Sequence, residues 1–183
     1  MRVIGGIYRG RRLRAPAGFD ARPTSDRLRE TLFNILAPLV EGSRFLDLCA
    51  GTGAVGIEAL SRGSSSVTFI DRSRRACAVI ESNLATLGVT SNATIINREA
   101  ASALKRLADT AAKFDIVFFD PPYASEIYSQ VMRQLASGGL LDPKAIVIAE
   151  HRAKAPPETE FGGLRIYREV KQGESALAFY ARV

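Results

Sequence analysis

The 183-residue chain is 46% hydrophobic and 24% charged, a composition typical of one globular domain with a sizeable core. No apolar run approaches the roughly 20 residues of a membrane helix, and the N-terminus lacks the apolar core of a secretory signal. We therefore expect a cytoplasmic protein with no membrane partner. Two cysteines and one histidine exclude a disulfide framework and indicate no metal site.

The positive charge is concentrated at the start of the chain. Residues 1–30 carry a net charge of +5, while the whole chain carries +6. Eight arginines lie in this stretch: Arg2, Arg9, Arg11, Arg12, Arg14, Arg22, Arg27 and Arg29. The planar guanidinium pairs with phosphate and stacks on bases, so the segment suits a nucleic-acid partner. A solvated charged surface explains the cluster equally well.

The first elements in chain order are an arm and a helix. Residues 2–14 alternate short β-prone pieces with glycines, which predicts a β-hairpin. We take residues 1–24 as a basic N-terminal hairpin arm and residues 25–183 as the core of a single domain that spans 1–183. A helix follows Ser25, because apolar residues recur on one face until Pro38, where we expect it to stop.

From residue 44 onward, strand and helix patterns alternate. Apolar strands are predicted at 44–48, 66–70, 93–97, 114–119 and 145–150, and helices at 54–61, 73–87, 99–110 and 125–136. Such alternation predicts an α/β fold, in which a parallel sheet has helices on both faces. Residues 164–171 and 175–182 predict a final hairpin, and residues 156–163 predict an irregular connection. We expect a doubly wound, mainly parallel seven-stranded sheet whose last hairpin supplies the antiparallel strand.

A glycine-rich turn follows the first predicted strand. The run Phe45–Gly56 reads FLDLCAGTGAVG, so a buried strand ends in Gly51-Thr52-Gly53 and a helix follows. Glycines let backbone N–H groups approach a ligand closely. The same letters fit G-x-G-x-x-G, the dinucleotide fingerprint, but many tight strand–helix turns satisfy that pattern. The turn alone therefore leaves NAD, S-adenosylmethionine and a purely structural role open.

Acidic residues near the strand ends favour S-adenosylmethionine over NAD. Asp47 could receive the cationic amino-acid end of that ligand, whereas a pyrophosphate would find the negative charge unfavourable. Asp71 ends the next strand, where an acid would hold ribose hydroxyls in either kind of fold. Glu99-Ala100 is placed to contact the adenine, although Glu99 could equally be a solvated acid in the first turn of a helix. The expected cofactor-binding residues are Asp47, Cys49, Ala50, Gly51, Thr52, Gly53, Asp71, Arg72, Glu99 and Ala100.

The sequence Asp120-Pro121-Pro122-Tyr123 follows another apolar strand. Two prolines stiffen a loop at the edge where open α/β sheets bind ligands. The nitrogen of an aryl amine is a poor nucleophile, because its lone pair is delocalised into the ring. Asp120 and the Pro121 carbonyl can each accept one amino hydrogen and so orient the nitrogen, while Tyr123 can stack on the base. We expect these four residues to form the catalytic loop. A proline-stiffened turn with a packed tyrosine is the structural alternative.

Together, Asp47, Gly51-Thr52-Gly53 and Asp120-Pro121-Pro122-Tyr123 resemble the class I amino-methyltransferases, which share a Rossmann-like fold. The N-terminal sequence narrows the resemblance to the bacterial small-subunit rRNA guanine-N2 methyltransferases. The residues that carry it are Ile4-Gly5-Gly6, Arg9-Gly10-Arg11, Arg22-Pro23-Thr24, Arg27 and Arg29–Asn34, with Lys171, Gly173 and Ser175–Leu177 in the tail. The resemblance covers nearly the whole chain and implies an N-terminal hairpin that helps to hold RNA.

The resemblance implies methyl transfer from S-adenosylmethionine to a guanine N2, which leaves S-adenosylhomocysteine and requires no metal. The implied partner is small-subunit rRNA, free or in an assembling ribonucleoprotein particle, and we expect a monomer. The residues expected to contact RNA are Arg9, Arg11, Arg12, Arg14 and Arg22. This chain departs from the family pattern by having Asp71 where glutamate is usual, Glu99 where aspartate is usual, and Gln172-Gly173 in place of Tyr-Gly.

Three rival functions remain open. A DNA adenine-N6 methyltransferase would use the same loop, but 183 residues leave no segment that resembles a separate target-recognition domain. A nicotinamide oxidoreductase would explain the glycine turn and not the proline loop. A non-catalytic RNA-binding module would retain the fold without the reaction, and the intact loop argues against it.

Overall fold

The computed structural model describes residues 1–15, 25–121 and 127–183. The helices are α1 Asp26–Val40, α2 Ala54–Ser61, α3 Arg74–Leu87, α4 Ala100–Asp109 and α5 Ile127–Ser137. The strands are β1 Arg44–Leu48, β2 Ser66–Asp71, β3 Ala93–Asn97, β4 Phe114–Phe119, β5 Leu141–Arg152, β6 Glu160–Phe161, β7 Leu164–Gln172 and β8 Ser175–Arg182. Every helix in these ranges is too short or too polar to span a bilayer.

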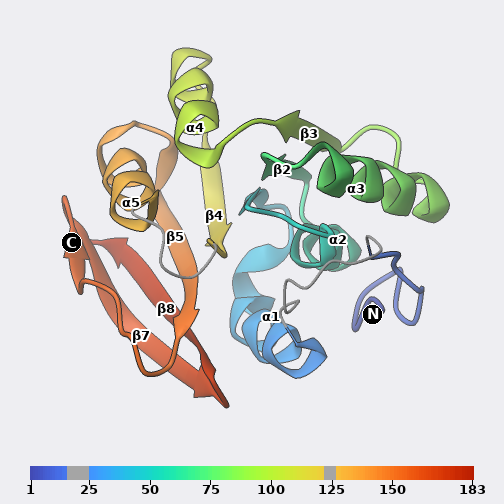
Figure 1. Cartoon of the computed structure of the whole chain (residues 1–183), viewed down its shortest axis with the longest axis horizontal. Helices are drawn as coiled ribbons and strands as arrows, with labels where there is room; N and C mark the ends of the chain where they lie inside the picture. The colour runs from blue at the N-terminus through green and yellow to red at the C-terminus, as the bar shows by residue number, and fades with distance from the viewer. Residues whose placement is uncertain (16–24, 122–126) are drawn as a thin grey trace.

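All the strands belong to one sheet, in the order β3-β2-β1-β4-β5-β8-β7-β6 (Figure 1). The first five strands of that order pair in parallel, and β8, β7 and β6 add antiparallel partners. From β1 the chain winds outward to β2 and β3, and it then returns to β4 on the other side of β1. The strand order therefore reverses between β1 and β4, and ligands of open α/β sheets bind outside the carboxyl ends of strands at such a point.

Helices cover both faces of the sheet (Figure 1). One apolar cluster joins α1, α2 and α3 to the face that carries Phe45, Phe69 and Phe118. A second cluster joins α4 and α5 to the opposite face, which carries Leu46 and Phe119. Residues next to each other in a strand thus enter opposite clusters, as the two-residue period of a strand requires. The expected doubly wound α/β fold is confirmed.

The described sheet has eight strands, one more than expected. The additional strand is β6, a two-residue strand inside the connection that we expected to be irregular. Phe161 of β6 is buried against Tyr128 and Tyr180, so packing orders this short segment. The strand predicted at 145–150 is also longer, because β5 extends in both directions along its partners.

The expectation that Pro38 stops the first helix was wrong. The helix continues through Pro38 to Val40. Proline lacks an N–H, but in the last turn of a helix this removes only one hydrogen bond. Val40 is buried, and its carbonyl accepts a hydrogen bond from the Ser43 hydroxyl at 2.7 Å. Burial and this bond to the final turn hold the last two residues in the helix.

The N-terminal arm folds back on itself as a hairpin, but it lacks the regular strands of the expected β-hairpin. Its two halves are joined by Val3 N–H to the Arg11 carbonyl at 3.0 Å and by Leu13 N–H to the Met1 carbonyl at 3.1 Å. Arg2 and Arg12 form an isolated antiparallel bridge. Since Val3 and Leu13 are buried in the same apolar cluster as α1 and α2, the arm belongs to the packed body of the protein.

Candidate active site and the N-terminal arm

The turn between β1 and α2 requires glycine. Cys49, Gly51 and Gly53 all have positive φ angles, at 61°, 56° and 74°. A Cβ on Gly53 would lie 2.9 Å from Cγ1 of Ile80, a fully buried side chain. The turn thus combines left-handed backbone with close packing, and it keeps a bare backbone surface at the carboxyl end of β1.

Asp47, near the end of β1, is hydrogen-bonded to the first turn of the helix that follows the glycine turn. Its carboxylate is almost completely buried, and Oδ2 accepts a hydrogen bond from the Gly56 N–H at 2.9 Å. Burial, which the Gly56 hydrogen bond opposes and the nearby Asp71 carboxylate reinforces, raises the pKa of Asp47 to about 7. One oxygen therefore holds the start of α2. The expected contact with the amino-acid end of the cofactor remains a proposal.

Asp71, at the end of β2, also binds the turn. Its Oδ2 accepts from Gly51 N–H and its Oδ1 from Ser73 N–H, both at 2.8 Å. A carboxylate oxygen can accept a second hydrogen bond, so these contacts leave acceptor capacity for ribose hydroxyls. Arg72 lies next to it with an exposed side chain.

Glu99 is the N-cap of α4. Its carboxylate accepts hydrogen bonds from Ala101 N–H at 3.2 Å and Ser102 N–H at 3.1 Å. Glu99 is therefore a capping residue that stabilises the helix, and not a solvated acid within its first turn. Ala100 is buried beside it. A contact from either residue to adenine is still a prediction.

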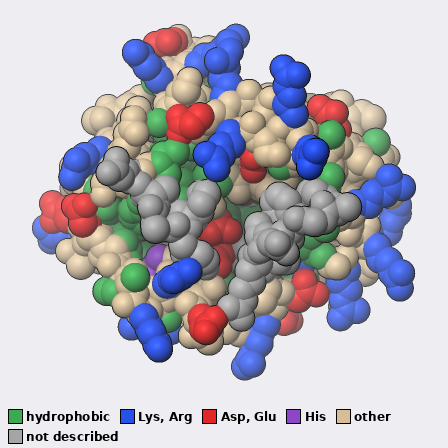
Figure 2. Space-filling view, in the orientation of Figure 1, with side chains coloured by type: hydrophobic (Ala, Val, Ile, Leu, Met, Phe, Trp, Pro, Cys, Tyr) green, Lys and Arg blue, Asp and Glu red, His purple; other side chains and the backbone are tan. Residues whose placement is uncertain are grey.

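Acidic groups from four strand ends surround Cys49. Burial, followed by the charges of Asp71, Asp120, Asp47 and Glu99, raises the pKa of this thiol to about 12. In Figure 2, some acidic side chains are visible in the middle of the face shown, and others lie toward the rim among Lys and Arg side chains. A concentrated negative field attracts a cation and repels a pyrophosphate. The field and the bare glycine turn therefore fit a cationic ligand such as a sulfonium cofactor.

The predicted catalytic loop begins at this same edge. Asp120 N–H donates to the Leu48 carbonyl at 3.3 Å, which ties the end of β4 to the end of β1. Burial, then the charges of Glu150 and Asp47, hold the pKa of Asp120 well above its usual range. Pro121 is buried. Pro122 and Tyr123 lie outside the described residues, so the proposed stacking by Tyr123 stays a prediction.

Glu150 is a candidate site residue that sequence reasoning missed. Phe119 of β4 pairs with Ala149 of β5, so the next residues, Asp120 and Glu150, are neighbours at the sheet edge. Glu150 is buried directly after the apolar part of its strand. The signal was present in the sequence, because Ile146–Ala149 ends in an acid just as the strand before Asp71 does.

The arm is fixed to α2 by Glu58. This buried carboxylate accepts hydrogen bonds from Ile4 N–H at 2.8 Å and Gly5 N–H at 2.7 Å. It also accepts from Arg62 Nε at 2.8 Å and lies 3.8 Å from Nε of the fully buried Arg29. The Nη2 of Arg29 in turn donates to the Arg2 carbonyl at 2.6 Å.

Asn83 of α3 joins the arm to the glycine turn. Its side-chain amide donates to the Arg14 carbonyl at 3.1 Å and the Thr52 carbonyl at 3.2 Å, and its Oδ1 accepts from Arg14 N–H at 2.8 Å. The arm therefore supports the same turn that is expected to hold the cofactor. A clean division between an RNA-binding arm and a catalytic core does not describe this contact.

The arginines of the arm fall into two groups. Arg11 donates to the Thr86 carbonyl at 2.8 Å and Arg14 to the Ser82 hydroxyl at 3.2 Å, both on α3. Arg9 and Arg12 are exposed, and within the described ranges their guanidinium groups have no such partner. Arg22 lies in the part of the chain that is not described. None of these positions shows RNA contact by itself.

Across residues 1–15, 25–121 and 127–183, no group of three or more histidine, cysteine or acidic side chains has metal-binding geometry.

Comparison with known proteins bears on the fold and the family. Residues 1–181 match the family model described as "Conserved hypothetical protein 95". The chain is 37% identical over 182 residues to ribosomal RNA small subunit methyltransferase D of Escherichia coli (strain K12), an alignment that covers 100% of this chain and 90% of the relative.

Solved structures agree with that match. The Escherichia coli protein yhhF has a TM-score of 0.88 and 38% identity, over 100% of this chain and 97% of the other. The methyltransferase structure SMU.776, solved in complex with S-adenosylhomocysteine, has a TM-score of 0.69 over 85% of this chain and 49% of the other; at 16% identity it supports the fold alone. The sequence resemblance predicted the family of small-subunit rRNA methyltransferases, and a relative with that name aligns with the full chain. The family model matches nearly the whole chain, so this chain belongs to the Conserved hypothetical protein 95 family.

Proposed function

We propose that the chain is a methyltransferase that transfers a methyl group from S-adenosylmethionine to the N2 amino group of a guanine in small-subunit rRNA. The observation that carries the proposal is the gathering of Asp47, Asp71, Glu99 and Asp120 at the strand ends around the glycine turn. Support for the RNA comes from the relative named as a small-subunit rRNA methyltransferase. The proposal includes a single chain acting in the cytoplasm.

The residues present fit this cofactor. Asp47, the turn Cys49–Gly53, Asp71 with Arg72, and Glu99-Ala100 would hold it, and a structure of the same fold was solved with S-adenosylhomocysteine. S-adenosylmethionine supplies an electrophilic methyl group on a cationic sulfur. The surrounding carboxylates match that positive charge, and the raised pKa values of Asp47 and Asp120 are consistent with a site that lacks its cation.

Asp120 is proposed to orient the target amine. Its position at the end of β4, tied to β1, holds the carboxyl group at the point where the strand order reverses. It would accept one amino hydrogen and the Pro121 carbonyl the other, so the nitrogen lone pair faces the methyl group. Orientation and exclusion of water then supply most of the rate enhancement. Proton loss follows methyl transfer, when the amine has become cationic and a nearby carboxylate can accept the proton.

Single-turnover methylation of small-subunit rRNA, naked and in the ribosomal particle, tests the proposal. We expect mass spectrometry of the digested RNA to find N2-methylguanosine. Asp120→Ala should lose at least about 100-fold in rate while it keeps most of the cofactor affinity, because the amine then has one orienting acceptor fewer. The control Asp142→Ala removes a partly exposed acid that pairs with Arg44 at the amino ends of the parallel strands. Its methylation rate should stay near the wild-type value. A methylated adenine, an unmodified rRNA, or normal turnover by Asp120→Ala would contradict the proposal.

A further inference from the structure

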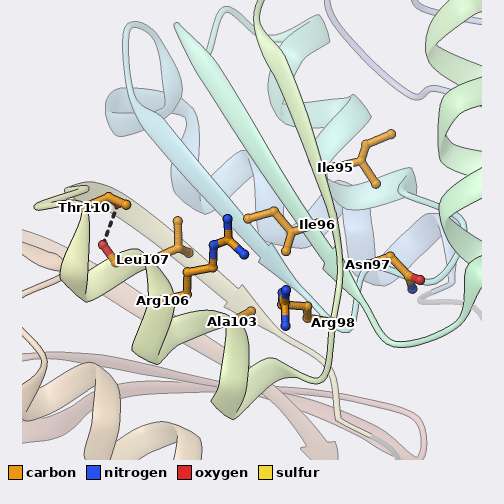
Figure 3. Close-up of a pocket in the computed structure, with 8 residues that line it drawn as sticks. All are labelled: Ile95, Ile96, Asn97, Arg98, Ala103, Arg106, Leu107 and Thr110. Carbon is orange, nitrogen blue, oxygen red and sulfur yellow. Dashed lines mark hydrogen bonds between the residues drawn. The ribbon is translucent and has the colours of Figure 1, made fainter.

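A pocket of about 350 Å³ lies between the edge strand β3 and helix α4 (Figure 3). Ile95, Ile96 and Asn97 line it from the end of β3, and Arg98 lines it from the position that follows the strand. Ala103, Arg106, Leu107 and Thr110 line it from the helix, where their spacing places them on one stripe. The volume is at the lower end of the range for small-ligand sites.

The pocket exists because the sheet ends at β3. Ile96 and Leu107 pack only partly against the cluster under α4, since no further described strand lies beyond β3 to fill the space beside them. Their exposed sides give the pocket an apolar floor. A simple packing gap at a sheet edge would have this floor as well, so the charged groups above it decide what the pocket can bind.

Two arginines border this apolar floor. Figure 3 shows Arg106 reaching from α4 toward Ile96, and Arg98 lying beside Ala103, so both guanidinium groups lie between helix and strand. Among the described residues, neither group has a carboxylate or hydrogen-bond partner. By contrast, Arg44 and Arg165 pair with acids at 2.6 Å and 3.0 Å. Two cations over an apolar surface match a phosphate joined to a flat apolar ring.

One hydrogen bond and one peptide bond join residues of the pocket to residues of the candidate active site. Asn97, which also lines it, donates from its side-chain amide to the Asp71 carbonyl at 3.0 Å. Arg98 is followed by Glu99, the cap of α4 and an expected cofactor contact. A strand of RNA that delivers a base to Asp120 could therefore continue to the pocket along the carboxyl edge of the sheet.

We propose that this pocket binds a nucleotide of the substrate RNA near the target base, with its phosphate at Arg98 and Arg106 and its base against Ile96 and Leu107. The inference rests on the proposed function and adds a second RNA-binding surface on the opposite face of the sheet from the arm. A guanidinium can bind phosphate in a bidentate manner and can stack on a base, which an ammonium does less well. The site holds RNA near the cofactor without taking part in methyl transfer.

The test compares three double variants of the full chain on an rRNA fragment that contains the methylated site. Arg98→Gln/Arg106→Gln removes both charges, and Arg98→Lys/Arg106→Lys keeps the charge without the planar group. Lys113→Gln/Lys144→Gln is the control. It removes the same charge near the starts of β4 and β5, at the amino ends of the parallel strands and away from the candidate active site. RNA affinity is measured at several salt concentrations, and cofactor affinity is measured by calorimetry.

We expect the glutamine pair to weaken RNA binding at least about tenfold and to reduce the slope of log affinity against log salt by about 0.7 for each phosphate that is no longer neutralised. The lysine pair should recover the slope and only part of the affinity. The control should keep most of the affinity. RNA should also shift the methyl resonance of Ile96 in labelled protein and leave that of the buried Ile57 unchanged.

Each other outcome overturns the inference in a distinguishable way. If the glutamine pair binds and methylates RNA as the control does, the pocket is a packing gap while the proposed function stands. If cofactor affinity falls instead of RNA affinity, the pocket belongs to the cofactor site. If the wild-type chain neither binds nor methylates the rRNA, the proposed function fails and this inference fails with it.

Discussion

Individual carboxylates at the sheet edge are held in an unfavourable state. Burial, reinforced by the charge of Asp71, raises the pKa of Asp47. Burial, reinforced by the charges of Glu150 and Asp47, raises the pKa of Asp120. A raised pKa means that the folded protein binds a proton more tightly than the unfolded chain does. The free energy of unfolding therefore falls as pH rises toward and through the folded-state pKa. A bound cation would lower both pKa values and relieve that repulsion. The same residues thus reduce stability and prepare a site for positive charge.

Gly53 permits the most specific test at this scale. Gly53→Ala must hold φ at +74° and place its Cβ 2.9 Å from Ile80. Left-handed backbone costs a non-glycine residue about 1–2 kcal/mol, and overpacking a core typically adds about 1–3 kcal/mol. Because the displaced segment is the predicted cofactor turn, affinity for S-adenosylmethionine should also fall at least about tenfold. Urea unfolding and calorimetry measure the two effects.

Gly88→Ala is the matched control for this change. Gly88 ends α3 at the same φ of +74°, and a Cβ there would meet nothing within 4 Å. The control should lose about 1–2 kcal/mol of stability and keep its cofactor affinity. Equal cofactor affinity in both folded variants would show that the turn does not hold the cofactor.

At the scale of elements, the arm presents two kinds of arginine. Arg9→Gln/Arg12→Gln removes guanidinium groups that are exposed and have no partner in the described part of the chain. This variant should weaken rRNA binding and reduce the salt slope by about 0.7 for each phosphate that these side chains neutralise in the wild type, with cofactor affinity unchanged. Filter binding at several salt concentrations measures the slope.

Arg11→Gln/Arg14→Gln removes the same charge from side chains that bind α3. We expect a smaller reduction of the slope, because these groups already contact the protein. If both double variants reduce the slope equally, only the total charge of the arm matters. An unchanged slope in both would mean that these four arginines form a solvated surface with no role in RNA binding.

The parts of the fold that repeat locally could be predicted from sequence. β1, β3, β4 and α2 have the predicted bounds. Short apolar runs mark the strands, and α2, which is buried along its whole length, is marked by the glycine turn before it. The eighth strand could not be predicted, because Phe161 is ordered by two tyrosines from other elements. The hydrogen-bond partners of the arm could not be predicted either, because Glu58 and Ile4 are 54 positions apart in the sequence. For the site, sequence located the strand-end acids but not their hydrogen bonds to the backbone.

Across the whole molecule, one buried network connects the arm, α1 and α2. Glu58 accepts from the arm and from Arg62, and its charge balances Arg29, whose Nε and Nη1 have no hydrogen-bond partner among the described atoms. Burial lowers the pKa of Arg29, and Asp26 and Glu58 oppose that effect. Removal of one partner from such a group leaves a buried charge uncompensated, which usually costs about 3–5 kcal/mol.

The network makes a prediction that involves three elements at once. In Glu58→Gln, one carboxylate oxygen becomes an amide NH₂, which would face the N–H of Ile4 or Gly5. Arg29 also loses the buried one of its two counter-charges in the described part of the chain and keeps only the more exposed Asp26. We expect a loss of about 3–5 kcal/mol in the free energy of unfolding and faster hydrogen exchange at Val3 and Leu13. Cofactor affinity should fall too, since Asn83 links the arm to Thr52. Glu160→Gln, which breaks an exposed pair with Arg165, should cost less than about 1 kcal/mol and serves as the control. If Glu58→Gln instead loosens the arm while cofactor affinity stays at the wild-type value, the arm does not support the turn, and its hydrogen bonds serve stability alone.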